Sequence, residues 1–223
     1  NCDGSNVCDD VEPIGVTTIC DTPAEVGVPT LTTMPVRLSS GAPKKVPIGP
    51  AVAAFDASNT DTTGPAPGQP PAGRIRILTD KDGDGFYESA TTFADKLLFA
   101  NGLLLWKDGV MVTAAPNISF LRDTDGDGKA DRTEILYEGF AAQNPQLRVS
   151  HPVLGLDNWI YVSNGLRGGQ VRRSGSSAKP VNLGGMDFRF DLIQDRYEAV
   201  SGMGQYGNTF DDWGRRFVCD NHD

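Results

Sequence analysis

The sequence predicts an all-β fold made of β-propeller blades, and three observations support this prediction. Two nine-residue acidic loops begin 43 residues apart, at Asp80 and Asp123. Units in which an acidic turn precedes alternating apolar residues recur at 107–112, 156–162 and 211–218. Short strands that repeat every 40 to 50 residues or so are typical of a β-propeller, because a single blade cannot bury both faces of its sheet without neighbours.

Each acidic loop has the spacing of a calcium-binding loop. Carboxylates occupy loop positions 1, 3, 5 and 9, and position 6 is Gly85 in the first loop and Gly128 in the second. This spacing surrounds one cation with hard oxygen donors, the glycine permits a sharp turn, and the backbone carbonyl at position 7 is a further expected donor. We therefore predict two Ca²⁺ sites, with the expected ligands Asp80, Asp82, Asp84, Phe86, Glu88, Asp123, Asp125, Asp127, Lys129, Asp131 and Glu134.

Three other interpretations of these loops are less favoured. Mg²⁺ prefers fewer protein ligands and keeps its waters, and a solvated turn without metal would leave four carboxylates repelling one another. Glu134, at position 12, completes an EF-hand pattern in the second loop, but the residues on either side (117–122 and 132–137) lack the helical stripe that an EF-hand requires. Before the first loop, 74–78 alternates in the period of a half-buried strand. Both loops are therefore predicted to be the tips of β-hairpins.

The chain divides into two parts. Residues 1–45 are rich in proline and threonine and predict an extended N-terminal arm with cysteines, whereas 46–223 predicts a propeller segment of about three and a half blades. A closed propeller needs four to eight blades or so, and we therefore expect the chain to be a piece of a longer protein or to be completed by another chain. The expected units are an inner strand at 51–55, blades at 74–94, 101–139 and 148–202 with an insertion at 168–185, and a fourth blade from 207.

Charge and cysteine usage limit the class of protein. The two loops supply −6 of the formal net charge of −9, so the acidity is mostly local, and without a basic stripe a nucleic-acid partner is not expected. No apolar run is long enough for a transmembrane span. Cys2, Cys8, Cys20 and Cys219 favour disulfides and a secreted or periplasmic location over buried free thiols, and their pairing stays open.

A resemblance to a known group of proteins is carried by five segments, which are 74–85, 112–117, 121–131, 155–161 and 202–218. They closely resemble the large extracytoplasmic β-propeller proteins of planctomycetes and verrucomicrobia that are often labelled membrane-bound dehydrogenases. This group is similar in fold to the soluble quinoprotein sugar dehydrogenases, which use pyrroloquinoline quinone (PQQ) and calcium. The resemblance covers about residues 50–221, and it implies a dehydrogenase only where the catalytic residues carry over.

The catalytic histidine implied by the resemblance falls at Leu147, which cannot move a proton. His151, four residues later, is a weak catalytic candidate whose alternative is a buried polar plug. Arg148, at the start of an inner strand, and Arg167, in a loop, are weak candidates for binding a carboxylate or a quinone, with ion pairs as the alternative. Three tryptophans at successive turns predict packing between blades rather than sugar stacking, and these are Trp106, Trp159 and Trp213.

Two functions are compatible with these features. The favoured hypothesis is a calcium-binding extracytoplasmic propeller segment that acts as a binding or assembly scaffold, with carbohydrate, further copies or the remaining blades as partners. The alternative is a quinoprotein-like dehydrogenase domain that oxidises sugars or alcohols, and the leucine at position 147 counts against it.

Overall fold

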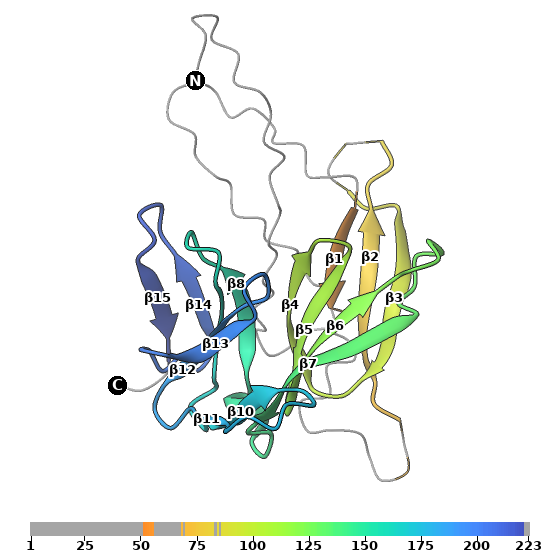
Figure 1. Cartoon of the computed structure of the whole chain (residues 1–223). Helices are drawn as coiled ribbons and strands as arrows, with labels where there is room; N and C mark the ends of the chain where they lie inside the picture. The colour runs from red at the N-terminus through yellow and green to blue at the C-terminus, as the bar shows by residue number, and fades with distance from the viewer. Residues whose placement is uncertain (1–50, 56–67, 69, 83, 85, 221–223) are drawn as a thin grey trace, which may run out of the picture.

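The computed structural model describes residues 51–55, 68, 70–82, 84 and 86–220, and within them it is all-β without an α-helix. The strands form four antiparallel sheets (Figure 1). The first sheet contains β1 (Ala51–Phe55), β2 (Gly73–Thr79) and β3 (Ser89–Leu97). The second sheet contains β4 (Ala100–Trp106), β5 (Gly109–Ala114), β6 (Asn117–Arg122), β7 (Arg132–Phe140), β10 (Gly169–Arg173) and β11 (Val181–Asn182). The third sheet contains β8 (Ser150–Leu154), β9 (Ile160–Ser163), β12 (Asp187–Asp191) and β13 (Arg196–Val200), and the fourth sheet contains β14 (Gly207–Phe210) and β15 (Arg216–Cys219).

The first strand of each sheet lies against the first strand of the next. β4 contacts both β1 and β8, and β8 contacts β14. From its first strand, each sheet continues outward through antiparallel neighbours, as in the order β8, β9, β12, β13 of the third sheet. A short 3₁₀ helix, η2 (Pro145–Leu147), precedes β8. The sheets therefore stand side by side with their first strands adjacent.

The insertion at 168–185 is placed differently from the sequence prediction. It was expected within the third blade, but its strands β10 and β11 extend the outer edge of the second sheet by pairing with β7. Arg172 faces Glu138 across this pairing, and its Nε donates to the carboxylate at 2.9 Å. An outer strand edge offers unpaired backbone groups, so a nearby hairpin can add to it whatever its position in the chain.

The second sheet buries both of its faces. On β5, Val110 and Val112 point to one side and Met111 to the other, as the two-residue period of a strand requires. Towards the first sheet, the buried cluster consists of Ile75, Phe93, Ala100, Leu103, Val110, Val112 and Leu121. Towards the third sheet, it includes Leu104, Met111, Ile118, Phe120, Tyr137, Phe140, Ile160, Val162, Phe188 and Phe190. The hydrophobic cores therefore lie between sheets.

The junction between the third and fourth sheets is more polar. Asp187 on β12 is fully buried, and its carboxylate accepts from the backbone N–H of Asn164 at 2.8 Å and from Arg216 Nη2 at 2.7 Å. Arg216 also donates to Asn208 Oδ1 at 3.2 Å, and the ring of Phe210 packs edge-on against Tyr161 with 4.9 Å between centroids. A buried ion pair with further hydrogen bonds thus joins these two sheets.

The described part of the chain contains no helix of the length and apolar character that a membrane crossing requires.

Replacement of Arg216 by methionine is expected to destabilise the folded chain by about 3–5 kcal/mol, because it leaves the buried carboxylate of Asp187 without its cation. The matched control is Arg215→Met at the neighbouring position. The side chain of Arg215 is 69% exposed, against 11% for Arg216, and its ion pair with Asp211 is a surface pair worth about 1 kcal/mol or less. Urea unfolding measures both, and equal effects would contradict a special role for the buried pair.

Candidate metal centre

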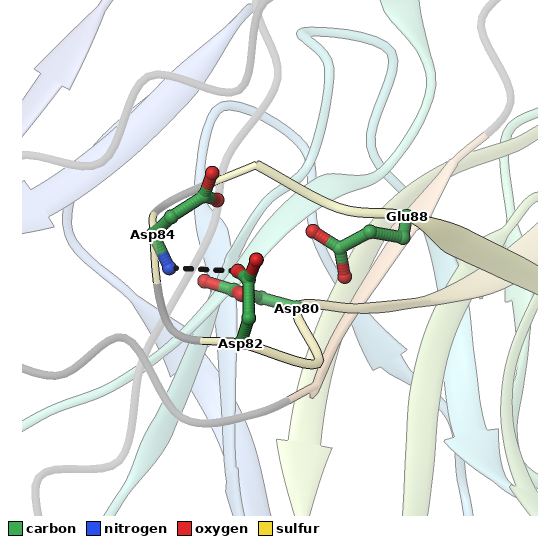
Figure 2. A group of neighbouring side chains, drawn as sticks. All are labelled: Asp80, Asp82, Asp84 and Glu88. Atoms are coloured by element: carbon green, nitrogen blue, oxygen red, sulfur yellow. Dashed lines mark hydrogen bonds between the residues drawn. The ribbon is translucent and has the colours of Figure 1, made fainter.

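The first acidic loop connects β2 to β3, which pair antiparallel up to Thr79 and Ser89, so the loop is the tip of a hairpin. One carboxylate oxygen from each of its four acids lies within 4.8 Å of the others. Figure 2 shows Asp80, Asp82 and Asp84 along one arm of the turn, with Glu88 facing them from the returning arm. Oxygens that share a Ca²⁺ at about 2.3–2.6 Å lie within roughly 5 Å of one another, so the donor set fits this ion.

The second acidic loop connects β6 to β7, and it is also the tip of an antiparallel hairpin. Its corresponding group consists of Asp123, Asp125 and Asp127, again with ligand oxygens within 4.8 Å of one another. Because strands flank both loops, the EF-hand interpretation is excluded by the structure, as the sequence pattern indicated.

The two loops share one internal hydrogen-bond pattern. In the first, Asp84 N–H donates to Asp82 Oδ1 at 3.2 Å and Phe86 N–H donates to Asp84 Oδ1 at 2.8 Å. In the second, the same loop positions give Asp127 N–H to Asp125 Oδ1 at 3.2 Å and Lys129 N–H to Asp127 Oδ1 at 2.8 Å. The acid at position 9 also closes each loop in the same way.

In this closure, Glu88 accepts from Lys81 N–H at 2.7 Å, and Asp131 accepts from Thr124 N–H at 3.0 Å. The hydroxyl of Thr124 donates a further bond to Asp131 at 2.6 Å. The described residues of the two segments therefore share these hydrogen bonds. The sequence analysis did not predict Thr124 as a loop-closing residue. Its position directly after the first aspartate could have indicated this role, because threonine hydroxyls often form local hydrogen bonds in turns.

Hydrogen bonds hold two carboxylates of the second loop in their ionised form. The backbone N–H of Gly128 donates to Asp123 Oδ2 at 2.8 Å and that of Gly126 donates to Asp123 Oδ1 at 2.6 Å, and chiefly the Gly128 bond lowers the pKa of Asp123. The Thr124 hydroxyl, followed by its N–H, lowers the pKa of Asp131. Gly126 and Gly128 both have φ above +80°, a conformation that favours glycine.

The second loop is attached to the first sheet. The backbone N–H of Ala130 donates to the carbonyl of Phe93 on β3 at 2.7 Å, and Ala130 packs against the cluster between the first two sheets. The connection between β6 and β7 reaches β3 in Figure 1. The candidate metal loop therefore lies at the junction of two sheets.

Several predicted ligands lie outside the two carboxylate groups. The carboxylate of Asp131 accepts a hydrogen bond from the hydroxyl of Thr124. Glu134 lies exposed on β7, opposite Phe120 of β6. For Phe86 and Lys129, the structure gives the backbone N–H bonds described above, and the ammonium of Lys129 also lies 4.0 Å from Asp127 Oδ2. Gly85 lies outside the described residues. The carboxylate groups thus hold four predicted ligands in the first loop and three in the second.

Residues 53–223 match the model of a protein family described as a domain of unknown function, DUF7133. This match covers more than half of the chain. The chain belongs to the DUF7133 family. No curated protein and no solved structure matches it. Both acidic loops lie within the DUF7133 region, whereas the predicted N-terminal arm lies outside that region and outside the described residues.

Of the catalytic candidates in the DUF7133 region, His151 lies where β4, β8 and β14 meet. Its backbone has φ of 51°, its carbonyl accepts from Asn208 Nδ2 at 2.6 Å, and its Nδ1 lies 3.0 Å from Ser150 Oγ. A side chain at Gly102 of β4 would come within 2.8 Å of its backbone nitrogen, so close packing requires glycine there. Burial lowers the pKa of His151.

The remaining candidates of the DUF7133 region are placed as follows. Arg148 was predicted to start an inner strand, but it directly follows η2. Its side chain is buried, with the guanidinium carbon 3.4 Å from the centroid of the Phe99 ring. Its Nε donates a hydrogen bond to the carbonyl of Ala142 at 2.9 Å. Arg148 is therefore a buried residue packed on an aromatic ring. Leu147 ends η2 instead of lying on a strand, and Arg167 is exposed in a loop.

The tryptophans differ from one another. Trp106 packs against the core between the second and third sheets, as predicted. Trp159 lies beneath the guanidinium groups of Arg189 and Arg196, at 4.5 and 4.8 Å from the ring centroid. Trp213 is 78% exposed, so the described residues do not supply the packing between blades that was predicted for it. The sheet to which it belongs has two strands, and they do not cover it.

The pKa of Asp123 is lower in the folded chain than in the unfolded chain, so its ionised form stabilises the fold above the unfolded pKa of about 3.9. This contribution is lost as the pH falls through the lower, folded pKa. In EDTA, the difference in Tm between wild type and Asp123→Asn is therefore expected to be largest near neutral pH and to shrink below about pH 4. A difference that stays constant from pH 7 to pH 2.5 or so would contradict this electrostatic account.

Proposed function

We propose that this chain is a calcium-binding extracytoplasmic β-propeller segment that acts as a binding or assembly scaffold. The observation that carries the proposal is the pair of acidic loops, in which carboxylate oxygens converge within 4.8 Å at two hairpin tips with the same internal hydrogen bonds. Carboxylate oxygens at this spacing are the ligands that Ca²⁺ prefers, and millimolar calcium outside the cytoplasm fills sites of modest affinity.

The arrangement of the sheets supports the propeller part of the proposal. Four antiparallel sheets stand with their first strands adjacent, and the third runs outward as an up-and-down series of four strands, which is the form of a propeller blade. The cores lie between sheets, as stacked blades require.

Calcium would have a structural effect at the second loop. A cation shared by Asp123, Asp125 and Asp127 would remove the repulsion between them and fix the loop that contacts Phe93 and the core between the first two sheets. Each bound ion would therefore stiffen a turn, and the ion in the second loop would also hold two sheets together.

The fourth sheet supports the assembly part of the proposal. Of the described strands, only β14 pairs with β15, so the other edge of β15 carries no neighbour within the described structure. Phe217 on this strand is 54% exposed, and Trp213 lies in the preceding turn. An open strand edge with exposed aromatic residues suits packing against further β-structure, either the remaining blades or another copy.

Calcium titration of the EDTA-treated chain is expected to fill two sites and to raise Tm, because a ligand that binds only the folded state stabilises it by about 2.7 kcal/mol at 100 times its Kd. Asp82→Asn and Asp125→Asn are each expected to weaken one site on the order of tenfold or more, since ligand charge sets calcium affinity. Isothermal titration calorimetry and differential scanning calorimetry measure the two effects.

Asp212→Asn is the matched control, because Asp212 is an exposed acid in the turn between β14 and β15, outside both loops. It is expected to leave both sites unchanged. An unaltered Tm in EDTA and in millimolar calcium, with no heat of binding, would overturn the proposal.

The alternative is a quinoprotein-like dehydrogenase, and the observation that favours it is His151, a half-buried imidazole at the meeting point of three first strands. The other candidates give PQQ no support, since Arg148 is packed on Phe99 and Arg167 lies exposed in a loop. Dye reduction by the calcium-loaded chain with PQQ and an aldose is therefore expected to stay at background. Reduction that requires PQQ and is lost in His151→Ala would favour the enzyme over the scaffold.

A further inference from the structure

We infer that calcium binding at the two acidic loops is positively coupled through β3, so that an ion in one loop raises the calcium affinity of the other. The inference rests on the calcium sites proposed above and adds the route by which they influence each other. It is carried by two contacts of the second loop with β3 and by the position of the first loop at the start of the same strand.

The second loop lies along β3 at its positions 6 and 8. The backbone N–H of Ala130, at position 8, donates to the carbonyl of Phe93 at 2.7 Å. A side-chain carbon at Gly128, position 6, would lie 3.9 Å from Cγ2 of Thr91. Gly128 and Ala130 are two residues apart, as are Thr91 and Phe93, so the loop segment and the strand run side by side over this stretch.

Phe93 is the extra residue of a β-bulge. In the pairing of β2 with β3, Arg76 faces Thr92 and Ile75 faces Ala94, so β3 has one more residue than β2 over this stretch. The carbonyl of Phe93 accepts from the second loop, and its side chain is buried in the core between the first two sheets. The bulge therefore fixes one end of the segment 89–93.

The first loop fixes the other end of this segment. Glu88, at position 9, directly precedes Ser89, the first residue of β3, and it faces the aspartates of the opposite arm (Figure 2). Thr91 lies three residues beyond Glu88, which is about 10 Å along a strand. The residues at 90–92 are exposed, and among the described strands β3 pairs with β2 and forms the outer edge of its sheet. The order of this exposed edge segment therefore depends on its two ends.

An ion in the first loop would hold the two arms of its hairpin together. Without an ion, the carboxylates of the two arms repel one another, which favours separation of β3 from β2 at its start. With an ion, the segment that Gly128 and Ala130 contact is already ordered when the second ion binds. The second ion then meets a smaller entropic cost, and by thermodynamic linkage the effect has the same size in the reverse direction.

Charge alone would give coupling of the opposite sign. Each loop has four acids and one lysine, hence a formal charge of −3, and a bound Ca²⁺ changes it to −1. A less negative first loop attracts the second ion more weakly, but over about 10 Å or more this effect is largely screened at about 0.15 M salt, where the Debye length is about 8 Å. Positive coupling would therefore identify the structural route.

The test is a calcium titration followed by NMR at the backbone amides of Lys81 and Thr124, which occupy position 2 of the two loops and make the same closing bond. In Asp82→Asn/Asp84→Asn, the first loop has the formal charge of −1 that it has with an ion bound. Half-saturation of the second loop is expected to need about threefold more calcium in this variant than in wild type. A threefold shift is the square root of a roughly tenfold coupling between two sites of equal affinity.

Asp125→Asn/Asp127→Asn is the reciprocal variant, and it is expected to shift half-saturation of the first loop by about the same factor. In this chain, calcium is expected to slow hydrogen exchange of the Ala130 amide severalfold, because that amide bonds to β3. The control is the amide of Ile193, which donates to Asp191 at 2.9 Å in the turn after β12 of the third sheet. Its exchange is expected to be the same with and without calcium.

Wild type alone provides a test that needs no variant to fold. At both reporter amides, the calcium dependence is expected to have a Hill coefficient of about 1.5. Hyperbolic curves at both amides, or half-saturation of the second loop at equal or lower calcium in Asp82→Asn/Asp84→Asn, would overturn the coupling and leave the calcium sites standing. If neither amide responds to calcium, the proposed sites fail and the coupling fails with them.

Discussion

Stacking of one sheet against the next is the interaction on which the rest of this structure depends. Val110, Met111 and Val112 follow one another on β5, yet they are buried in two separate clusters. A strand that is apolar on both sides is stable in water only when both sides are covered. The second sheet meets this condition through its neighbours, and the positions of the hairpin tips and of the first-strand junctions follow from it.

The stacking of the sheets makes the second acidic loop part of a contact between two sheets. A carboxylate cluster on an isolated hairpin would affect only its own turn, but the second loop also contacts β3 through Ala130 and Phe93. Repulsion between its carboxylates therefore acts at a junction between sheets. The donors already present, among them the N–H groups of Gly126 and Gly128, satisfy part of that charge. A cation bound in this loop would therefore act on the contact between the first two sheets.

The junction of the third and fourth sheets is held by polar contacts and not by an apolar core alone. Asp187, Arg216 and Asn208 form a hydrogen-bonded series that ends at the carbonyl of His151. Buried polar groups are costly unless they are satisfied, and a satisfied network specifies one relative position of the parts that it joins. The same network holds His151 beside Gly207 and Cys219.

The sequence alone was sufficient for the all-β class, for the two hairpin tips and for the starts of most units, because these depend on local spacing: carboxylates at alternate loop positions, glycine at the turn and apolar residues with a period of two. Contacts between distant segments needed the tertiary structure. Only the tertiary structure showed that β10 pairs with β7 and extends its sheet, and that Arg148 packs on Phe99. It also showed that the hydroxyl of Thr124 donates to the carboxylate of Asp131 and that Trp213 is exposed to solvent. It also brought Cys219 and His151, 68 residues apart in the chain, to the same glycine, Gly207. Local periodicity determines which face of a strand is apolar, whereas the choice of the surface that covers it depends on how the sheets pack in three dimensions.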